Sequence, residues 1–251
     1  MPVLALLFFV TAALYAAVGF GGGSTYNALL VLAETDYRVL PSVALLCNLI
    51  VVTGGVLQYR RSGDLNLGFV LPFVALSIPM AWLGGRAPIE QSTFVLLLGL
   101  SLFAAGVAMW FQKPRVDAAP SGSPLVNWFV GLPLGAGFGL LAGMVGIGGG
   151  IFLAPCLHLL RLAEPKRIAA TASFFIMVNS IAGLIGQTMK QGTLEHLEAM
   201  TDYGWLALAV LIGGQIGSRL STGALSGRVV KRLTAILVLY VAGRLLYMSL
   251  P

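Results

Sequence analysis

The stretch Gly146-Ile147-Gly148-Gly149-Gly150 decides the fold, together with its earlier counterpart Gly19-Phe20-Gly21-Gly22-Gly23. Each cluster interrupts a long apolar run, where glycine is unfavourable because it packs no side chain and loses much backbone freedom in a helix. In lipid, a broken helix also leaves peptide groups without water, so it is tolerated only where protein buries it or a wet cavity adjoins it. Two such breaks predict two half-helices whose positive N-terminal ends face a common site. The alternative interpretation is that the glycines only allow helices to pack closely.

The composition indicates an integral membrane protein. The chain of 251 residues is 58% hydrophobic and only 10% charged, whereas soluble domains contain about 25% charged residues. The net charge of +6 does not indicate nucleic-acid binding, because the lysines and arginines lie in short loops between apolar runs. Cys47 and Cys156 lie in apolar runs without CxxC spacing, which indicates buried thiols rather than a redox or metal site.

Ten apolar segments are predicted to be helices, because they lack the period-2 alternation of a membrane β-barrel. They span residues 2–20, 24–33, 39–59, 65–85, 91–112, 125–145, 151–163, 168–189, 203–222 and 229–250. The two segments that follow the glycine clusters are short, and such helices extend about 15–20 Å, half to two-thirds of the hydrocarbon core. The first segment lacks the basic start of a signal peptide and carries a cluster of the repeat, so we expect it in the mature protein.

The two halves of the chain match beyond the glycine clusters, which begin at Gly19 and Gly146. A single constant offset in residue number carries Arg38 to Arg167, Gly54 to Gly183, Gln58 to Gln187, Gly63 to Gly192, and Gly84-Gly85 to Gly213-Gly214. This pattern predicts a duplicated unit. We expect a first transmembrane repeat over residues 1–112, a linker rich in Pro, Ser and Gly over 113–124, and a second repeat over 125–251.

The distribution of lysine and arginine favours repeats of opposite orientation. If each glycine-broken pair crosses the membrane once, the fifteen positive residues divide nine to six between the two faces. If each pair is instead a hairpin that enters and leaves on one face, they divide eleven to four, which agrees better with the positive-inside rule. The predicted fold is therefore an all-α integral membrane protein, an inverted repeat of two helical units that each contain a glycine-broken helical hairpin. Both termini are predicted to lie outside a bacterial-type inner membrane, and the depth of the hairpins stays open.

Few polar side chains lie near the breaks, and they are the candidates for ligand binding. Ser24, Thr25 and Asn27 follow the first cluster at the start of a short helix, where free N–H groups bind anions. The alternative for Ser24 is an ordinary N-cap. Asn48 and Asn179 are nearest to mid-helix, although buried amides often only join helices. The predicted substrate-binding residues are Gly21, Gly22, Gly23, Ser24, Thr25, Asn48, Gly148, Gly149, Gly150, Thr171, Ser173 and Asn179.

Missing motifs narrow the function. No Asp or Glu lies deep in an apolar segment. The sequence therefore lacks an obvious carboxylate of the kind that pumps use to carry protons through the membrane. The sequence contains no HExxH, GxSxG or P-loop pattern, which argues against a hydrolase or an ATPase. We therefore expect a protein that is not an enzyme and needs neither cofactor nor metal, and whose partners are a small anion and the lipid bilayer.

Two stretches of the second half resemble the TauE/SafE family of probable sulfite and organosulfonate exporters. They are Gly143-Met144-Val145-Gly146-Ile147-Gly148-Gly149-Gly150, with Pro155 after it, and Arg167-Ile168-Ala169-Ala170-Thr171-Ala172-Ser173. The resemblance covers nearly the whole chain, although Pro41-Ser42-Val43-Ala44 replaces the Thr-Ala-Ser pattern in the first half. It implies secondary transport of small sulfur-containing oxyanions, generally outward. Two alternatives stay open: a membrane scaffold or assembly protein in which the glycine breaks are packed dry, and an anion channel with a continuous wet pore.

Overall fold

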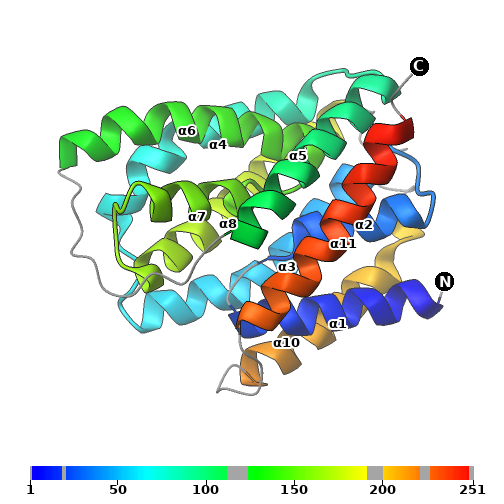
Figure 1. Ribbon diagram of the computed structural model, residues 1–251, viewed down its shortest axis with the longest axis horizontal. Coiled ribbons are helices and arrows are strands. Elements are labelled where there is room, and N and C mark those ends of the chain that lie inside the picture. The colour runs from blue at the N-terminus through cyan, green and yellow to red at the C-terminus, as the bar shows by residue number, and fades with distance from the viewer. Residues whose placement is uncertain (1, 19–20, 112–123, 191–199, 221–226, 249–251) are drawn as a thin grey trace.

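The computed structural model describes residues 2–18, 21–111, 124–190, 200–220 and 227–248, and every regular element in these ranges is a helix (Figure 1). The first half contains α1 (Pro2–Val18), α2 (Gly23–Leu32), α3 (Leu40–Arg61), α4 (Leu67–Arg86) and α5 (Gln91–Phe111). The second half contains α6 (Pro124–Val145), α7 (Gly150–Leu159), α8 (Pro165–Lys190), α10 (Gly204–Leu220) and α11 (Gly227–Met248). Each predicted segment coincides with one of these helices, so the prediction of an all-helical chain is confirmed. Gly19 and Gly192 lie outside the described residues.

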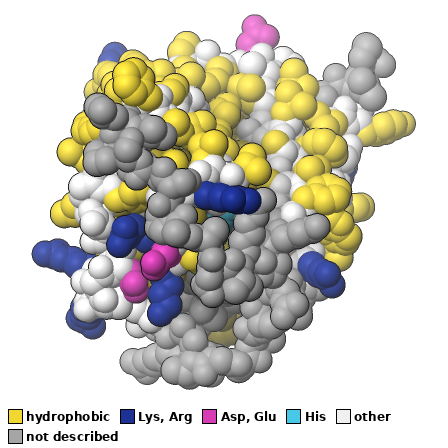
Figure 2. Space-filling view, turned by 60° about the vertical axis from the view of Figure 1, so that its left-hand side comes forward, with side chains coloured by type: hydrophobic (Ala, Val, Ile, Leu, Met, Phe, Trp, Pro, Cys, Tyr) yellow, Lys and Arg dark blue, Asp and Glu magenta, His cyan; other side chains and the backbone are white. Residues whose placement is uncertain are grey.

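The helices have the lengths and surfaces of membrane-spanning segments. Within the described residues, α3, α4, α5, α6 and α8 are long and apolar enough to cross a bilayer. Hydrophobic side chains cover the upper part of the face in Figure 2, whereas most of the Lys and Arg side chains in view lie in its lower half. Large apolar side chains such as Phe129 and Leu208 are more than half exposed. Such a surface suits lipid rather than water.

Two pairs of neighbouring helices pack closely through glycine, and each pair joins one half of the chain to the other. In α6, Gly135 and Gly143 approach the α4 backbone so closely that a Cβ at either position would overlap with it. In α10, Gly213 and Gly217 approach the α1 backbone in the same way. Figure 1 shows α6 alongside α4 and α10 alongside α1, on opposite sides of the bundle. Since α1 corresponds to α6 and α4 to α10, the same pairing occurs twice.

The corresponding helices α3 and α8 cross each other in the middle of the bundle and run antiparallel. Leu45, near the start of α3, lies close to Gly183, near the end of α8. Further along α3, Val52 packs with Ile176, which lies earlier in α8. The corresponding pair α5 and α11 also runs antiparallel, because a Cβ at Gly99 would lie near Leu246 and one at Gly106 near Leu239.

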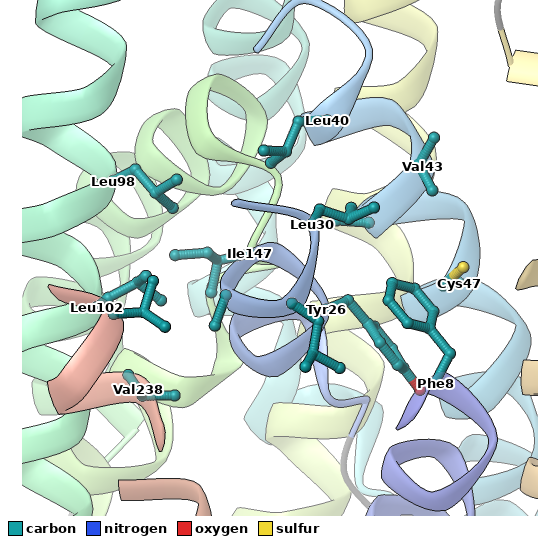
Figure 3. Packing of buried hydrophobic residues seen from close by; sticks show 14 of the residues in the cluster. Phe8, Tyr26, Leu30, Leu40, Val43, Cys47, Leu98, Leu102, Ile147 and Val238 are labelled. Carbon is teal, nitrogen blue, oxygen red and sulfur yellow. The ribbon is translucent and has the colours of Figure 1, made fainter. Parts of the chain in front are cut away.

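The main hydrophobic core surrounds α2 and joins both halves of the chain. Tyr26 and Phe8 are fully buried, and their rings stack with centroids 4.8 Å apart. Figure 3 shows Ile147, which belongs to the second glycine cluster, between Leu98 of α5 and Leu30 of α2. The core thus fixes the short helix α2 against the second glycine cluster.

The turns after the two short helices are also duplicated. Glu34 and its counterpart Arg161 both adopt left-handed backbone, with φ of 55° and 53°. The N–H of the following residue donates to Leu30 O at 3.0 Å after α2 and to Leu157 O at 3.2 Å after α7. Both helices therefore end in a Schellman motif. The two turns have the same backbone geometry although the residue at the left-handed position is acidic in the first half and basic in the second.

Candidate functional site

Each short helix begins at a glycine with left-handed backbone. Gly22 caps α2 with φ 91° and ψ 6°, and Gly149 caps α7 with φ 77° and ψ −20°. This region is accessible to glycine but strained for most other residues. Neither cap receives a side-chain hydrogen bond. Because Gly22 occupies the cap, the interpretation of Ser24 as an ordinary N-cap is wrong: Ser24 is the second residue of α2.

The cap carbonyls accept the first hydrogen bonds of both helices. Gly22 O accepts from the N–H groups of Thr25 and Tyr26, at 2.9 and 3.0 Å. Gly149 O accepts from those of Phe152 and Leu153, at 3.1 and 3.2 Å. The first two N–H groups of each helix precede these bonds, and they carry the positive end of the helix dipole. Each break therefore presents backbone donors without a charged side chain.

The two glycine clusters meet inside the bundle. A Cβ at Gly23 would lie 2.7 Å from the carbonyl oxygen of Ile147. A Cβ at Gly21 or at Gly148 would overlap with the side-chain amide of Asn48. Glycine is thus required for the close approach of three chain segments: both clusters and α3. The prediction that the clusters lie close together is confirmed.

Asn48 lies between the clusters and is fully buried. Its Nδ2 donates to Ile147 O at 3.4 Å and to Ser180 Oγ at 3.3 Å. Because Ile147 O is an acceptor, the amide nitrogen must face it, which turns Oδ1 toward Gly21. Oδ1 is buried and has no hydrogen-bond partner. An unsatisfied buried acceptor costs about 1–3 kcal/mol, so this atom marks a place where a donor would be stabilising.

Asn27 of α2 is a second amide at the site, although it is not among the predicted substrate-binding residues. Its Nδ2 donates to Val145 O, just before the second cluster, at 3.0 Å. Its Oδ1 is buried without a partner, like that of Asn48. The sequence contains a signal for it: Asn27 is a polar residue in an apolar segment, four positions after Gly23 and hence on the same helix face.

Ser24 and Thr25 lie at the first break with different surroundings. Both side chains are nearly buried, at 2% and 4% exposure. The Thr25 hydroxyl pairs with the Tyr15 hydroxyl at 2.9 Å, which ties α2 to α1. Ser24 therefore stays the better candidate for a ligand contact.

The predicted site residues on α8 bond within their own helix. Thr171 Oγ1 donates to Arg167 O at 2.8 Å, and Ser173 Oγ donates to Ala169 O at 2.9 Å. Asn179 Nδ2 donates to Phe175 O at 2.8 Å, and its Oδ1 is buried without a hydrogen-bond partner. The contact of α8 with the second cluster is instead made by four residues: Ala172, Phe175, Ile176 and Ser180. Ligand roles for Thr171, Ser173 and Asn179 remain predictions.

The site is closed and contains no formal charge. Residues 21–23 and 146–150 are all buried, so the clusters are shut off from both faces in this structure. None of the buried polar residues in the described part of the chain is charged. The positive ends of α2 and α7 are therefore not neutralised by a carboxylate, which favours an anionic ligand. Close packing also fits the scaffold alternative. Among the described residues, buried side-chain oxygens without a hydrogen-bond partner occur at Asn27 and Asn48 beside the clusters, and also at Tyr26 and Asn179.

Comparison with known proteins gives two matches over nearly the whole chain. The family described as sulfite exporter TauE/SafE matches residues 4–245. A relative named probable membrane transporter protein y4hK, from Sinorhizobium fredii (strain NBRC 101917 / NGR234), is 31% identical over 248 residues, which cover 97% of each chain. No solved structure matches significantly.

Proposed function

The chain belongs to the sulfite exporter TauE/SafE family, and from that premise we propose that it exports small sulfur-containing oxyanions, such as sulfite or organosulfonates. Its helices and its relative identify it as a multi-pass membrane transporter. The observation that carries the anion assignment is the convergence of two glycine-capped helix N-termini on Asn48. A bacterial inner membrane is the proposed location.

The proposed ligand sits between the two breaks and replaces their close contact. The leading N–H groups of α2 and α7 would donate to the oxyanion from opposite sides, and the Ser24 hydroxyl would add a further donor. A pyramidal or tetrahedral oxyanion suits this arrangement because it accepts many hydrogen bonds around one centre. Binding without a fixed cation avoids placing a full charge in lipid and leaves the complex weak enough to release its ligand.

The amide oxygens of Asn27 and Asn48, which have no hydrogen-bond partner, favour a protonated form of the anion. Asn48 Oδ1 accepts hydrogen bonds only, and it is buried beside the backbone of Gly21. A hydrogen sulfite ion has one O–H donor for such an acceptor, and its other oxygens accept from backbone N–H groups. Transfer of this species would carry a proton with the substrate, so no carboxylate is needed in the membrane.

We further propose that the two halves form an inverted repeat with both termini outside. The antiparallel course of α3 against α8 and of α5 against α11 supports this orientation, because corresponding helices of inverted repeats point in opposite directions. In this topology α2 and α7 start near the middle of the bundle and lead to opposite faces. Arg60 and Arg61 lie on the inner face, as the positive-inside rule requires.

Transport into or out of proteoliposomes tests the proposal. Purified protein is reconstituted, and the flux of sulfite, sulfate, sulfoacetate and taurine is followed with protein-free liposomes as the control. We expect saturable flux of sulfite or sulfoacetate. A protein that carries none of these anions, although correctly folded, would contradict the proposed substrate class.

A further inference from the structure

A pocket of about 620 Å³ lies where the end of α2 meets the α2–α3 turn, the start of α5 and the end of α11. Part of its lining is apolar and buried, including Leu40, Phe94 and Leu98. The rest carries charges of both signs, from Glu34, Asp36, Arg38 and Arg244. None of the described residues of either glycine cluster lines it. A pocket of this volume suits an organic ligand rather than a single small ion.

Asp36 and Arg38 stabilise the turn between α2 and α3. Asp36 Oδ1 accepts a hydrogen bond from the backbone N–H of Arg38 at 2.9 Å. The Arg38 guanidinium lies over the Tyr37 ring, with Cζ 5.7 Å from the ring centroid, and its Nε donates to the Tyr37 hydroxyl at 3.5 Å. The Tyr37 ring in turn contacts Phe94 of α5, with ring centroids 5.9 Å apart. These two charged residues therefore shape one side of the pocket.

Glu34 and Arg244 line the same pocket with opposite charges and do not pair with each other. Both side chains are exposed, and neither forms an ion pair or a hydrogen bond within the described part of the chain. The backbone of Glu34 is fixed by the Schellman motif after α2, and Arg244 lies near the end of α11. Two opposite charges, held by different elements, thus lie at one pocket without neutralising each other.

The balance of charge decides which class of ligand fits. Two carboxylates and two guanidinium groups line the pocket, so a simple anion such as sulfite meets as much repulsion as attraction. The same holds for a simple cation. A zwitterion satisfies both signs, because its oxyanion accepts hydrogen bonds from Arg244 and its ammonium group donates to Glu34.

The pocket lies at a membrane surface. Tyr247, which follows Arg244 near the end of α11, is 79% exposed. Exposed tyrosines and arginines at the ends of apolar helices are typical of the headgroup level of a bilayer. On α5, Leu96 is 43% exposed beside the lining residue Val95, so apolar surface continues outward from the pocket. A lipid headgroup can therefore reach the charged side chains while its hydrocarbon contacts apolar ones.

We propose that this pocket binds a zwitterion that combines an oxyanion with a primary ammonium group and bridges Arg244 and Glu34. Two sources have this chemistry: the headgroup of phosphatidylethanolamine, and free amino sulfonates in solution. The position at headgroup level and the apolar lining favour the lipid. The inference does not rest on the proposed function, because it concerns a site apart from the glycine clusters.

Thermal unfolding in detergent tests the site with short-chain lipids of matched acyl length. Dihexanoyl phosphatidylethanolamine should raise the Tm saturably, because a ligand that binds only the folded protein stabilises it. Phosphatidylcholine has no N–H donor for Glu34, and phosphatidylglycerol has no cation. We therefore expect each of these two lipids to need a concentration about fivefold higher or more for half of its effect.

Glu34→Gln and Arg244→Gln each remove one charge from an exposed position and should leave the fold intact. Each should raise the half-saturating concentration of phosphatidylethanolamine about fivefold or more. The matched controls are Glu90→Gln, next to the pocket but outside its lining, and Arg232→Gln, near the other end of α11. Both residues are exposed, and their variants should stay within about twofold of the unmodified protein.

Titration with taurine distinguishes the two sources. A saturable rise in Tm with taurine that both Glu34→Gln and Arg244→Gln weaken, without such a rise for phosphatidylethanolamine, assigns the site to a free zwitterion. The same dependence for phosphatidylethanolamine assigns it to the lipid. If neither compound gives a rise in Tm that depends on Glu34 and Arg244 but not on Glu90 and Arg232, the zwitterion site is overturned. Sulfite flux of the unmodified protein bears on the proposed function alone.

Discussion

Gly22 and Gly149 occupy the same structural position in the two halves of the chain: each caps a ten-residue helix with left-handed backbone. Their helices begin beside each other, with Asn48 between the clusters. A helix start inside a membrane protein leaves donors that lipid cannot satisfy. Two such starts at one place give a concentration of backbone donors, and this is the basis of the anion-binding proposal.

Asn48 should be the most sensitive side chain at the site. Asn48→Asp places a carboxylate beside the proposed anion, so we expect transport to be lost through like-charge repulsion. Asn48→Ala removes the amide and should weaken sulfite binding by about 1–3 kcal/mol, a factor of roughly 5 to 150 in KM. The matched control on the same helix is Thr53→Ala, because the exposed Thr53 side chain donates to Leu49 O within α3, and KM should change less than threefold. Radiolabelled flux measures both; equal effects of the two alanine variants would remove Asn48 from the site.

Substitution of Ser24 should weaken anion binding, whereas substitution of Thr25 should lower the stability of the protein. Ser24→Ala removes a buried hydroxyl from the break and should cost about 1–2 kcal/mol of affinity, or about 5- to 30-fold in KM. Thr25→Val removes the hydrogen bond to Tyr15, so we expect a lower Tm in detergent with little change in KM. Thermal unfolding and flux are measured on both variants. A Ser24→Ala protein with unchanged KM would mean that backbone donors alone hold the anion.

The proposed topology predicts which residues share a face. Single cysteines at Arg61 and Arg232 should react with an impermeant thiol reagent from the cytoplasmic side, in the background that lacks Cys47 and Cys156. Cysteines at Arg38 and Arg244 should react only from the outside. Labelling of cells and of inverted vesicles gives the answer, and reaction of positions 61 and 232 from opposite sides would contradict the inverted repeat.

Much of the fold was predictable because the membrane restricts the choices. Long apolar segments in lipid must be helices, so composition and length locate ten of them, and their ends differ from the structure by only a few residues. The glycine clusters were equally informative, because a glycine break in lipid needs a structural reason. Internal duplication then brought the two clusters to equivalent positions, and their contact follows from that symmetry.

The side chains at the site were predicted less well, since the contacts are set by tertiary packing. Asn48 and Asn179 look alike in the sequence, yet one lies between the clusters and the other donates along its own helix. The Thr25 hydroxyl is hydrogen-bonded to the Tyr15 hydroxyl, and the spacing of the two residues in the sequence does not reveal this contact.

The central claim is that the paired glycine-capped helix starts hold the anion. Binding of radiolabelled sulfite to purified protein in nanodiscs is the most direct measurement, made on the unmodified protein and on Gly149→Val and Gly243→Val. Gly149 has φ 77°, and a Cβ there would lie 2.8 Å from the Phe175 ring, whereas a Cβ at Gly243 would meet no atom within 4 Å. We predict saturable binding to the unmodified protein and to Gly243→Val, and its loss in a Gly149→Val protein that still elutes as a folded species. Full binding by folded Gly149→Val would contradict the account and show that the cluster serves packing alone.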